Sequence, residues 1–459
     1  MEARFPRSKE GQGRLLLGPA FGAQRCAGEG GMKPSRVVIT SYQVGFGDCF
    51  LLSFEYPAEK RHVLIDFGST GLPDGVPKNQ LDLIANDIAS RTKDQRLAVV
   101  ATHRHKDHIS GFTTKKQRPS SGKTIADLKP ELVLQPWTED PNLAVDARGP
   151  LPPGASLAAH HISSLAAMQQ AAGAIFNEVK RVRYLSPSLR QELSFMGENN
   201  LANREAVENL MTMSATREYA KAGDDTALED LLPGVKIDIL GPPSIEQSDK
   251  ITKQRSRDQD EFWHLMANAA ASLGPTKGQK VAPLFPDFSV ERVGSQFPID
   301  ARWIISQARR LRADQMLRLV RILDSVLNNT SLILLFQCGS KSLLFPGDAQ
   351  IENWSYALSQ PGVREKLRKV DLYKVGHHGS LNATPKSLWE LFDQKSDDDH
   401  AGRLQTLMST MAHKHGDEER RTEVPRQTLV QALDRESDFF TTQSLKENEL
   451  FHETVLDFP

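Results

Sequence analysis

The sequence contains few cysteines for its length. Of its 459 residues, only Cys26, Cys49 and Cys338 are cysteines. Three widely spaced thiols are too few for a disulfide framework or for a metal cage built from thiolates. A reducing compartment is the simplest interpretation, and we therefore expect a cytoplasmic location.

An excess of charge of one sign and a long apolar run are also missing. The chain has 57 Lys and Arg against 58 Asp and Glu, so its net charge gives no reason to expect a polyanion or an anionic membrane surface as partner. The longest strand-like apolar run, residues 332–336, is far shorter than the roughly 20 residues that cross a bilayer. We expect no membrane-embedded segment, and any preference for a polyanion must come from a local patch.

The composition is that of a globular protein, with 39% hydrophobic and 25% charged residues. The first 31 residues differ, because they are rich in Gly and Arg, and their apolar cluster at 15–17 is too short for a signal peptide. We predict a disordered tail over residues 1–31 and a folded domain over 32–459.

Short apolar segments separated by Gly, Asp or Pro predict a fold of the α/β class. The predicted strands are residues 37–42, 49–54, 62–66, 97–101, 132–134, 235–240, 331–337 and 342–345. Apolar residues at helical spacing predict a helix over 79–90. Two stretches, at about 142–230 and 250–327, are predicted to be helical insertions, and the second includes five arginines between residues 309 and 321.

A cluster of metal-binding side chains follows the predicted strand 97–101. It consists of His103, His105, Asp107 and His108. Side chains two residues apart in an extended loop point the same way, so His103 and His105 can bind one cation while Asp107 and His108 serve a neighbouring one. Imidazole and carboxylate ligands suit Zn²⁺, with Mn²⁺ as the alternative. The pattern therefore predicts a site for two divalent metal ions.

Several motifs, in this order along the chain, resemble those of the metallo-β-lactamase superfamily. They are residues 45–48, 64–68, the histidine loop, 234–243, 328–331, 345–348, 374–380 and Val424-Pro425 with Thr441. The closest resemblance is to the hydrolase domain of the bacterial DNA-uptake competence channel. It implies a four-layer αββα sandwich, here with helical insertions.

The resemblance also implies roles for later residues. Asp348 would bridge both metals, and either His377 or His378 would complete the second site while the other faces the substrate. Ser380, Asn382 and Lys374 would contact substrate oxygens. Asp48 and Asp66 would accept hydrogen bonds from the ligand imidazoles rather than bind metal.

The chain departs from the family pattern at two points. The only candidates for a third histidine on the first metal are His160, His161 and His264, which lie in predicted helices of the insertions. The metal at Asp107 and His108 is therefore the better supported of the two. Phe46 also occupies a turn position that is usually polar in the family.

The function expected from these residues is a metal-dependent hydrolase, a phosphodiesterase or nuclease, that uses a metal-bound hydroxide. The catalytic residues would be Asp107, His378 and Ser380. Hydrolysis of an ester, lactone or thioester is the enzymatic alternative, and a binding or regulatory protein that keeps the fold is the other. A nucleic acid could contact the arginines at 309–321 or the cluster at 366–369, although a solvated helix face explains both, and the first insertion could bind a protein partner.

Overall fold

The computed structural model describes residues 32–114, 119–140, 204–244, 246–248, 328–380, 383–414 and 423–458. The predicted tail, most of both predicted insertions and the arginines at 309–321 lie outside the described residues. So do His160, His161, His264 and Asn382. Within these ranges, every helix is too short or too polar to span a bilayer.

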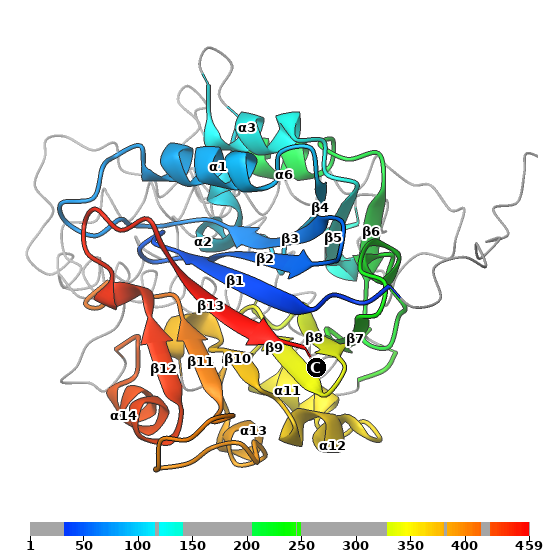
Figure 1. The fold of residues 1–459 in the computed structure, drawn as a ribbon, viewed down its shortest axis with the longest axis vertical. Helices are drawn as coiled ribbons and strands as arrows, with labels where there is room; N and C mark the ends of the chain where they lie inside the picture. The colour runs from blue at the N-terminus through cyan, green and yellow to red at the C-terminus, as the bar shows by residue number, and fades with distance from the viewer. Residues whose placement is uncertain are drawn as a thin grey trace, which may run out of the picture.

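The described residues form two mixed β-sheets that lie one on the other (Figure 1). The first runs in the order β13 (Phe451–Asp457), β1 (Arg36–Tyr42), β2 (Cys49–Glu55), β3 (Lys60–Phe67), β4 (Arg96–Val100), β5 (Leu132–Pro136) and β6 (Arg217–Ala220). The second runs β12 (Asp438–Thr441), β11 (Gln405–Met408), β10 (Leu372–Lys374), β9 (Lys341–Phe345), β8 (Ile333–Cys338) and β7 (Lys236–Gly241).

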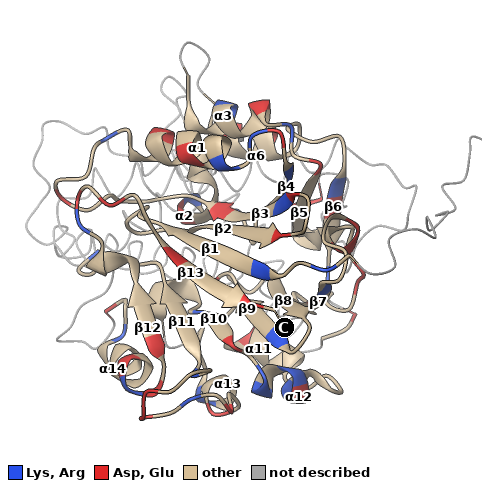
Figure 2. Ribbon diagram, viewed as in Figure 1, with Lys and Arg blue, Asp and Glu red and all other residues tan. Residues whose placement is uncertain are grey.

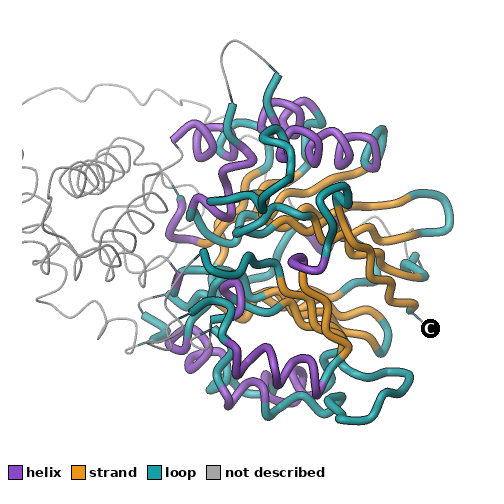
Figure 3. Tube along the Cα trace, turned by 90° about the vertical axis from the view of Figure 1, so that its left-hand side faces the viewer, coloured by secondary structure: helices purple, strands orange, loops and turns teal. Residues whose placement is uncertain are grey.

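Helices cover the outer face of each sheet, as the turned view in Figure 3 shows. α1 (Gln80–Arg91), α3 (Ser121–Asp127) and α6 (Arg204–Leu210) cover the first sheet. α11 (Ile351–Ala357), α12 (Val363–Arg368), α13 (Lys386–Trp389) and α14 (Gln427–Glu436) cover the second. Strands such as β4 and β8 are therefore buried on both faces, which explains their continuous apolar sequences.

Three apolar cores hold these elements together. One lies between the sheets and includes Phe50 and Leu334, and the other two lie between each sheet and its helices. Figure 2 shows the matching distribution of charge, in which Lys, Arg, Asp and Glu concentrate on helices, loops and strand ends. Burial of apolar surface on both faces of both sheets is the main stabilising contribution to this arrangement.

The structure confirms the α/β class, and its strands match the predicted ones to within a few residues. It corrects the end of the first predicted insertion, because residues 217–220 form β6 and pair in parallel with β5 instead of continuing a helical segment. No strand is predicted from the sequence at the positions of β10, β11, β12 or β13. β12 and β13 lie at sheet edges, where partial exposure leaves little apolar pattern to recognise.

The core between the sheets can be tested with two matched leucines. Leu334 in β8 is fully buried, whereas Leu83 on α1 is 38% exposed. Leu334→Ala should lower the free energy of unfolding by about 2–5 kcal/mol, because it removes buried methyl groups and leaves a cavity. Leu83→Ala should change it by less than about 1 kcal/mol. Urea unfolding followed by circular dichroism measures both, and equal effects would contradict the assigned core.

Candidate metal centre

The candidate site forms where strands of both sheets end. β3 and β4 are parallel neighbours in the first sheet, and β9, β10 and β11 are parallel neighbours in the second. Each is followed within a few residues by a polar side chain of the site: Asp66 closes β3, His103 follows β4, Asp348 follows β9, His378 follows β10 and Ser409 follows β11. Side chains from distant parts of the chain thereby meet without disturbing the apolar cores.

Asp66 fixes the start of the histidine loop. Its carboxylate accepts hydrogen bonds from the backbone N–H and the hydroxyl of Thr102, both at 2.7 Å. The backbone N–H of Asp48 also donates to the carbonyl of Asp107, at 2.9 Å. Glycine is required at position 68, because a Cβ there would lie 2.4 Å from the carbonyl carbon of Asp107. The loop is thus attached closely to the turns after β1 and β3.

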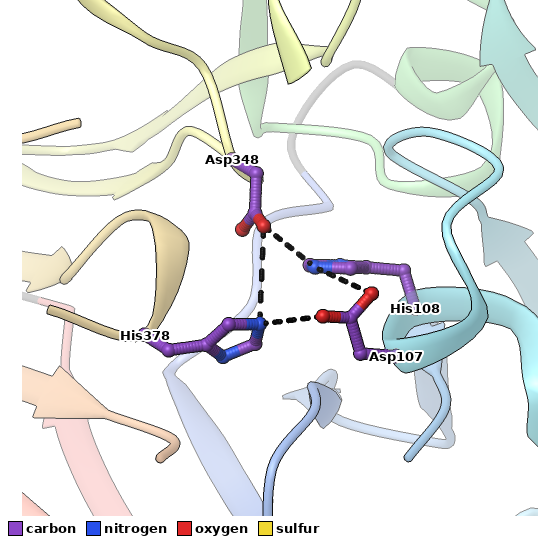
Figure 4. Close-up of side chains that lie close together, drawn as sticks. All are labelled: Asp107, His108, Asp348 and His378. Carbon is purple, nitrogen blue, oxygen red and sulfur yellow. Dashed lines mark hydrogen bonds and ion pairs between the residues drawn. The ribbon is translucent and has the colours of Figure 1, made fainter. Parts of the chain in front are cut away.

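The short helix α2 (Lys106–Ile109) presents Asp107 and His108 on neighbouring positions. Together with Asp348 and His378 they form a buried group whose ligand atoms all lie within 4.8 Å of one another. Figure 4 shows the four side chains pointing at a common centre. His108 Nε2 is 3.1 Å from Asp348 Oδ2, and His378 Nε2 is 3.1 Å from Asp107 Oδ2 and 3.8 Å from Asp348 Oδ2.

Hydrogen bonds on the far side of each ring orient the two imidazoles. His378 Nδ1 lies 3.0 Å from the carbonyl oxygen of Ser409, which can only accept, so Nδ1 carries a proton. His108 Nδ1 donates to the carboxylate of Asp66 at 2.7 Å. The ring of Phe46 packs against His378 with centroids 4.5 Å apart. Both Nε2 atoms therefore face the centre, as they would in a metal site whose imidazoles are held by outer partners.

These residues fit a divalent cation. Asp107 Oδ1, His108 Nε2 and Asp348 Oδ2 are buried and form no hydrogen bond within the described part of the chain, although His108 Nε2 and Asp348 Oδ2 form an ion pair. Buried polar atoms without partners are rare unless water or an ion satisfies them. Two carboxylates and two imidazoles are a donor set suited to Zn²⁺ or Mn²⁺. The buried cluster could hold a metal ion.

The electrostatics of the cluster also favour a cation. Burial opposes charge on His108, but the carboxylates of Asp348 and Asp66 raise its pKa well above the usual value. The carboxylates around His378 raise its pKa in the same way against the effect of burial. Burial would raise the pKa of Asp107, yet its hydrogen bond with His378 and the neighbouring imidazoles lower it to about 2. The nearby imidazoles likewise hold the pKa of Asp348 well below its usual value against the effect of burial, so the carboxylates of Asp107 and Asp348 favour the charged form and attract positive charge.

The structure distinguishes the two adjacent histidines. His378 is fully buried with its Nε2 in the cluster, whereas the side chain of His377 is 23% exposed and its Nε2 lies 3.8 Å from Asp348 Oδ2. Both residues have positive φ, 46° and 53°, which is uncommon for residues with a side chain. This strained turn directs His378 inward and leaves His377 at the edge of the site.

His103 and His105 form a looser pair. His103 Nε2 lies 3.0 Å from His105 Nδ1 and 3.9 Å from Asp348 Oδ2, and neither belongs to the compact metal-binding groups found among the described residues. Burial lowers the pKa of His103 well below its usual value and that of His105 to about 4. Both rings are therefore neutral at pH 7, as ligands must be. These two histidines and Asp348 would be the ligands of the first predicted metal.

Lys374 and Asp48 are placed differently from their predicted roles. Lys374 is only 2% exposed, and its ammonium pairs with Asp48 and lies 4.0 Å from Asp348 Oδ1. A buried, paired lysine is not available to contact a substrate. Asp48 bonds this lysine, while the Nδ1 atoms of His108 and His378 lie 3.8 and 3.5 Å from its oxygens. Asp66, by contrast, accepts from an imidazole as predicted.

The predicted substrate residue Ser380 follows His378 in the chain. It is half-buried, and its backbone N–H donates a hydrogen bond to the carbonyl of His377.

The basic residues of α12 lie near the amino end of β10, whereas the site lies at its carboxyl end. Lys366 pairs with Asp238 at 2.6 Å and Arg368 with Asp393 at 3.3 Å. Two of the three basic side chains of that cluster therefore have acidic partners, and the cluster lies away from the site.

Two residues of the site were missed from the sequence. Thr102 carries two hydrogen bonds to Asp66, and its position next to His103 was the only available signal. Ser409 orients His378 through its carbonyl and bonds the carbonyl of Gly47 through its hydroxyl at 2.5 Å. The sequence offered no signal for Ser409, because no strand is predicted at the position of β11, which brings Ser409 to the site.

A scan of the sequence against protein-family models gave no match, and a search of curated proteins gave none either. The site must therefore be interpreted from its own chemistry.

The compact cluster predicts that His378 is required for tight metal binding. His378→Ala should remove one ligand and lower the affinity for Zn²⁺ by at least about 100-fold, because few protein ligands would remain. Competition with a chromophoric chelator measures the affinity. The matched control is His400→Ala, since His400 is exposed and bonds only its neighbouring carbonyl. If the two variants bind Zn²⁺ with equal affinity, His378 is not a metal ligand.

The raised pKa values of His108 and His378 predict that metal loading releases protons. The neighbouring carboxylates favour the protonated form of both imidazoles, and a metal can bind only an unprotonated Nε2. Apparent affinity should therefore fall as the pH is lowered, by about tenfold per pH unit for each proton displaced. Calorimetric titration of Zn²⁺ at pH 7 in buffers of different ionisation enthalpy measures the release. A binding enthalpy independent of the buffer would contradict it.

Proposed function

We propose that this protein is a metal-dependent hydrolase that cleaves phosphodiesters, as a phosphodiesterase or a nuclease. The single observation that carries the proposal is the convergence of Asp107, His108, Asp348 and His378 in one buried cluster at the strand ends of two sheets. The layered arrangement of helices and sheets is compatible with the metallo-β-lactamase sandwich that the sequence motifs resemble.

The donor set supports a catalytic site over a purely structural one. Structural zinc sites are typically closed cages rich in thiolates, and catalytic sites use imidazoles and carboxylates and keep a position open. The described cysteines, Cys49 and Cys338, are buried elsewhere and are not part of the cluster. His377, at the partly exposed edge, marks the side from which a substrate could approach.

The chain's own residues divide into three groups by their contacts. Asp107, His108, Asp348 and His378 would hold a cation, with His103 and His105 beside them for a second. A bound divalent cation would lower the pKa of water and stabilise charge on phosphoryl oxygens. Asp66 and the carbonyl of Ser409 keep the ligand imidazoles in their orientation, and Lys374 balances part of the buried negative charge. His377 and Ser380 are the residues placed to contact substrate.

Phosphodiesters are favoured because their reaction places charge on several oxygens at once. Cationic and hydrogen-bonding groups around such a centre stabilise that charge without a nucleophile from the protein. The four residues of the cluster are aspartates and histidines, and none of them is a serine or cysteine that could act as the nucleophile. The resemblance of the motifs to the hydrolase domain of the DNA-uptake channel agrees with this substrate class.

The test is turnover by the metal-loaded protein. We expect cleavage of bis-p-nitrophenyl phosphate and of a single-stranded oligonucleotide, and a loss of at least about 100-fold in Asp348→Asn, because Asp348 contacts both His108 and His378. The control is Asp393→Asn on the surface, where the carboxylate meets only Arg368 among the described residues.

The assays separate the alternatives. Turnover of p-nitrophenyl acetate alone would replace the phosphodiester assignment with an ester, lactone or thioester hydrolase. Bound metal with no turnover of any of these substrates would favour a binding or regulatory protein. Unchanged activity in Asp348→Asn would refute the proposed site itself.

A further inference from the structure

A separate cavity opens among the helices that cover the first sheet. It has a volume of about 260 Å³ and lies among the loop after β3, the first turn of α1, the short helix η1 (Ser110–Phe112) and the start of α3. Its lining includes Ser69, Lys78, Asn79, Asp82, Ser110 and Ser121. The side chains of Ser69, Asp82 and Ser110 form hydrogen bonds with other described residues. Leu72 and Leu81 add an apolar part to the lining, so the cavity suits a small ligand with both polar and apolar surface.

Two of the loops that line this cavity also carry residues of the metal centre. Ser69 and Ser110 follow Asp66 and His108 by a few residues, and the hydroxyl of Ser110 bonds both the N–H and the carbonyl of Ser69, at 2.8 and 3.0 Å. On the other side, Gly71 accepts a hydrogen bond from the N–H of Phe46 at 2.8 Å. The ring of Phe46 packs on His378. The loops that line the cavity therefore also carry Asp66, His108 and the ring that packs on His378.

Three polar groups of the lining are available to a ligand. Ser121 is only 6% exposed, yet its hydroxyl has no hydrogen-bond partner in the described ranges. Asp82 accepts from the N–H of Ser121 through Oδ1 at 2.8 Å, and its Oδ2 has no other partner there. Lys78 makes no ion pair with any described residue. The cavity thus combines a hydroxyl, a carboxylate and an ammonium.

We infer that this cavity binds the ribose–phosphate unit of a ribonucleotide, so that the phosphodiester cleaved at the metal centre belongs to RNA rather than DNA. The inference rests on the proposed function. A site for phosphate alone would not carry a carboxylate in its wall, whereas the Asp82 carboxylate can accept a hydrogen bond from a sugar hydroxyl and Lys78 can neutralise the adjacent phosphate.

The sugar hydroxyl identifies the polymer. Within a nucleic-acid strand, both the 3′ and 5′ oxygens are esterified, so only the ribose 2′-hydroxyl remains to donate, and DNA lacks it. The volume is below the range of cavities that enclose drug-sized ligands, which fits one sugar–phosphate unit and leaves the base outside. The arrangement therefore selects the sugar without selecting the sequence.

Binding of matched oligonucleotides tests the inference. The full chain as purified is titrated into fluorescein-labelled oligouridylate and oligodeoxyuridylate of equal length, both with phosphorothioate linkages that resist cleavage. Fluorescence anisotropy should show RNA bound at least about tenfold more tightly, as expected for one hydrogen bond to a charged group. Equal affinity for the two polymers, or no binding of either, would overturn the inference.

Variants test whether the preference for RNA over DNA comes from the cavity. Asp82→Asn can still accept from the N–H of Ser121 but replaces the free acceptor with a donor, so it should weaken RNA binding to the level of DNA and leave DNA binding unchanged. Lys78→Met should weaken the binding of RNA and of DNA to the same extent, because both carry the phosphate. Asp74→Asn is the control, because Asp74 is exposed in the same loop outside the lining. Retained RNA preference in Asp82→Asn would refute the assignment.

An experiment can distinguish a wrong assignment of the cavity from a wrong proposed function. Bis-p-nitrophenyl phosphate contains no sugar, and its cleavage would continue if only the ribose–phosphate cavity were misassigned. Ser121→Ala is a second variant for the same cavity and should also reduce the RNA preference. Thermal unfolding of each variant identifies any that fails to fold.

Discussion

The structure of the site depends on four aspartates buried close together. Asp48, Asp66, Asp107 and Asp348 are each no more than 2% exposed. Buried carboxylates are costly unless positive charge or hydrogen-bond donors compensate them. Here the ammonium of Lys374, the imidazoles of His108 and His378, and the backbone of the histidine loop provide that compensation. A divalent cation would add further positive charge at the same place.

This constraint also explains the local geometry. The turn at His377 and His378 and the residue Asp66 all have positive φ, a conformation that side chains usually avoid. Glycines at positions 47 and 68 let backbones approach more closely than any Cβ would allow. Rigid strand ends of two sheets hold these strained segments in place, since the apolar cores behind them are fully buried. Stability of the sandwich thus maintains a site that would be unfavourable in isolation.

The sequence predicted the α/β class, most central strands and the histidine loop because these depend on short-range patterns. Apolar runs buried on both faces and closely spaced histidines are visible without knowledge of the fold. The features that the sequence did not predict depend on strands that pair although they are far apart in the chain. β13 pairs with β1 although they lie near opposite ends of the chain, and Ser409 reaches His378 only because β11 lies beside β10. The choice between His377 and His378 likewise follows from one strained turn, and the burial of Lys374 from its pairing with Asp48.

The central claim is that Asp107, His108, Asp348 and His378 form a metal centre. X-ray absorption spectroscopy of the Zn²⁺-loaded protein tests it most directly. We expect the metal to be surrounded by nitrogen and oxygen atoms only, at about 2.0–2.2 Å, with the outer scattering of imidazole rings. A sulfur shell near about 2.3 Å would instead place the metal on cysteine. That result, or a protein that retains no metal after dialysis, would contradict the account.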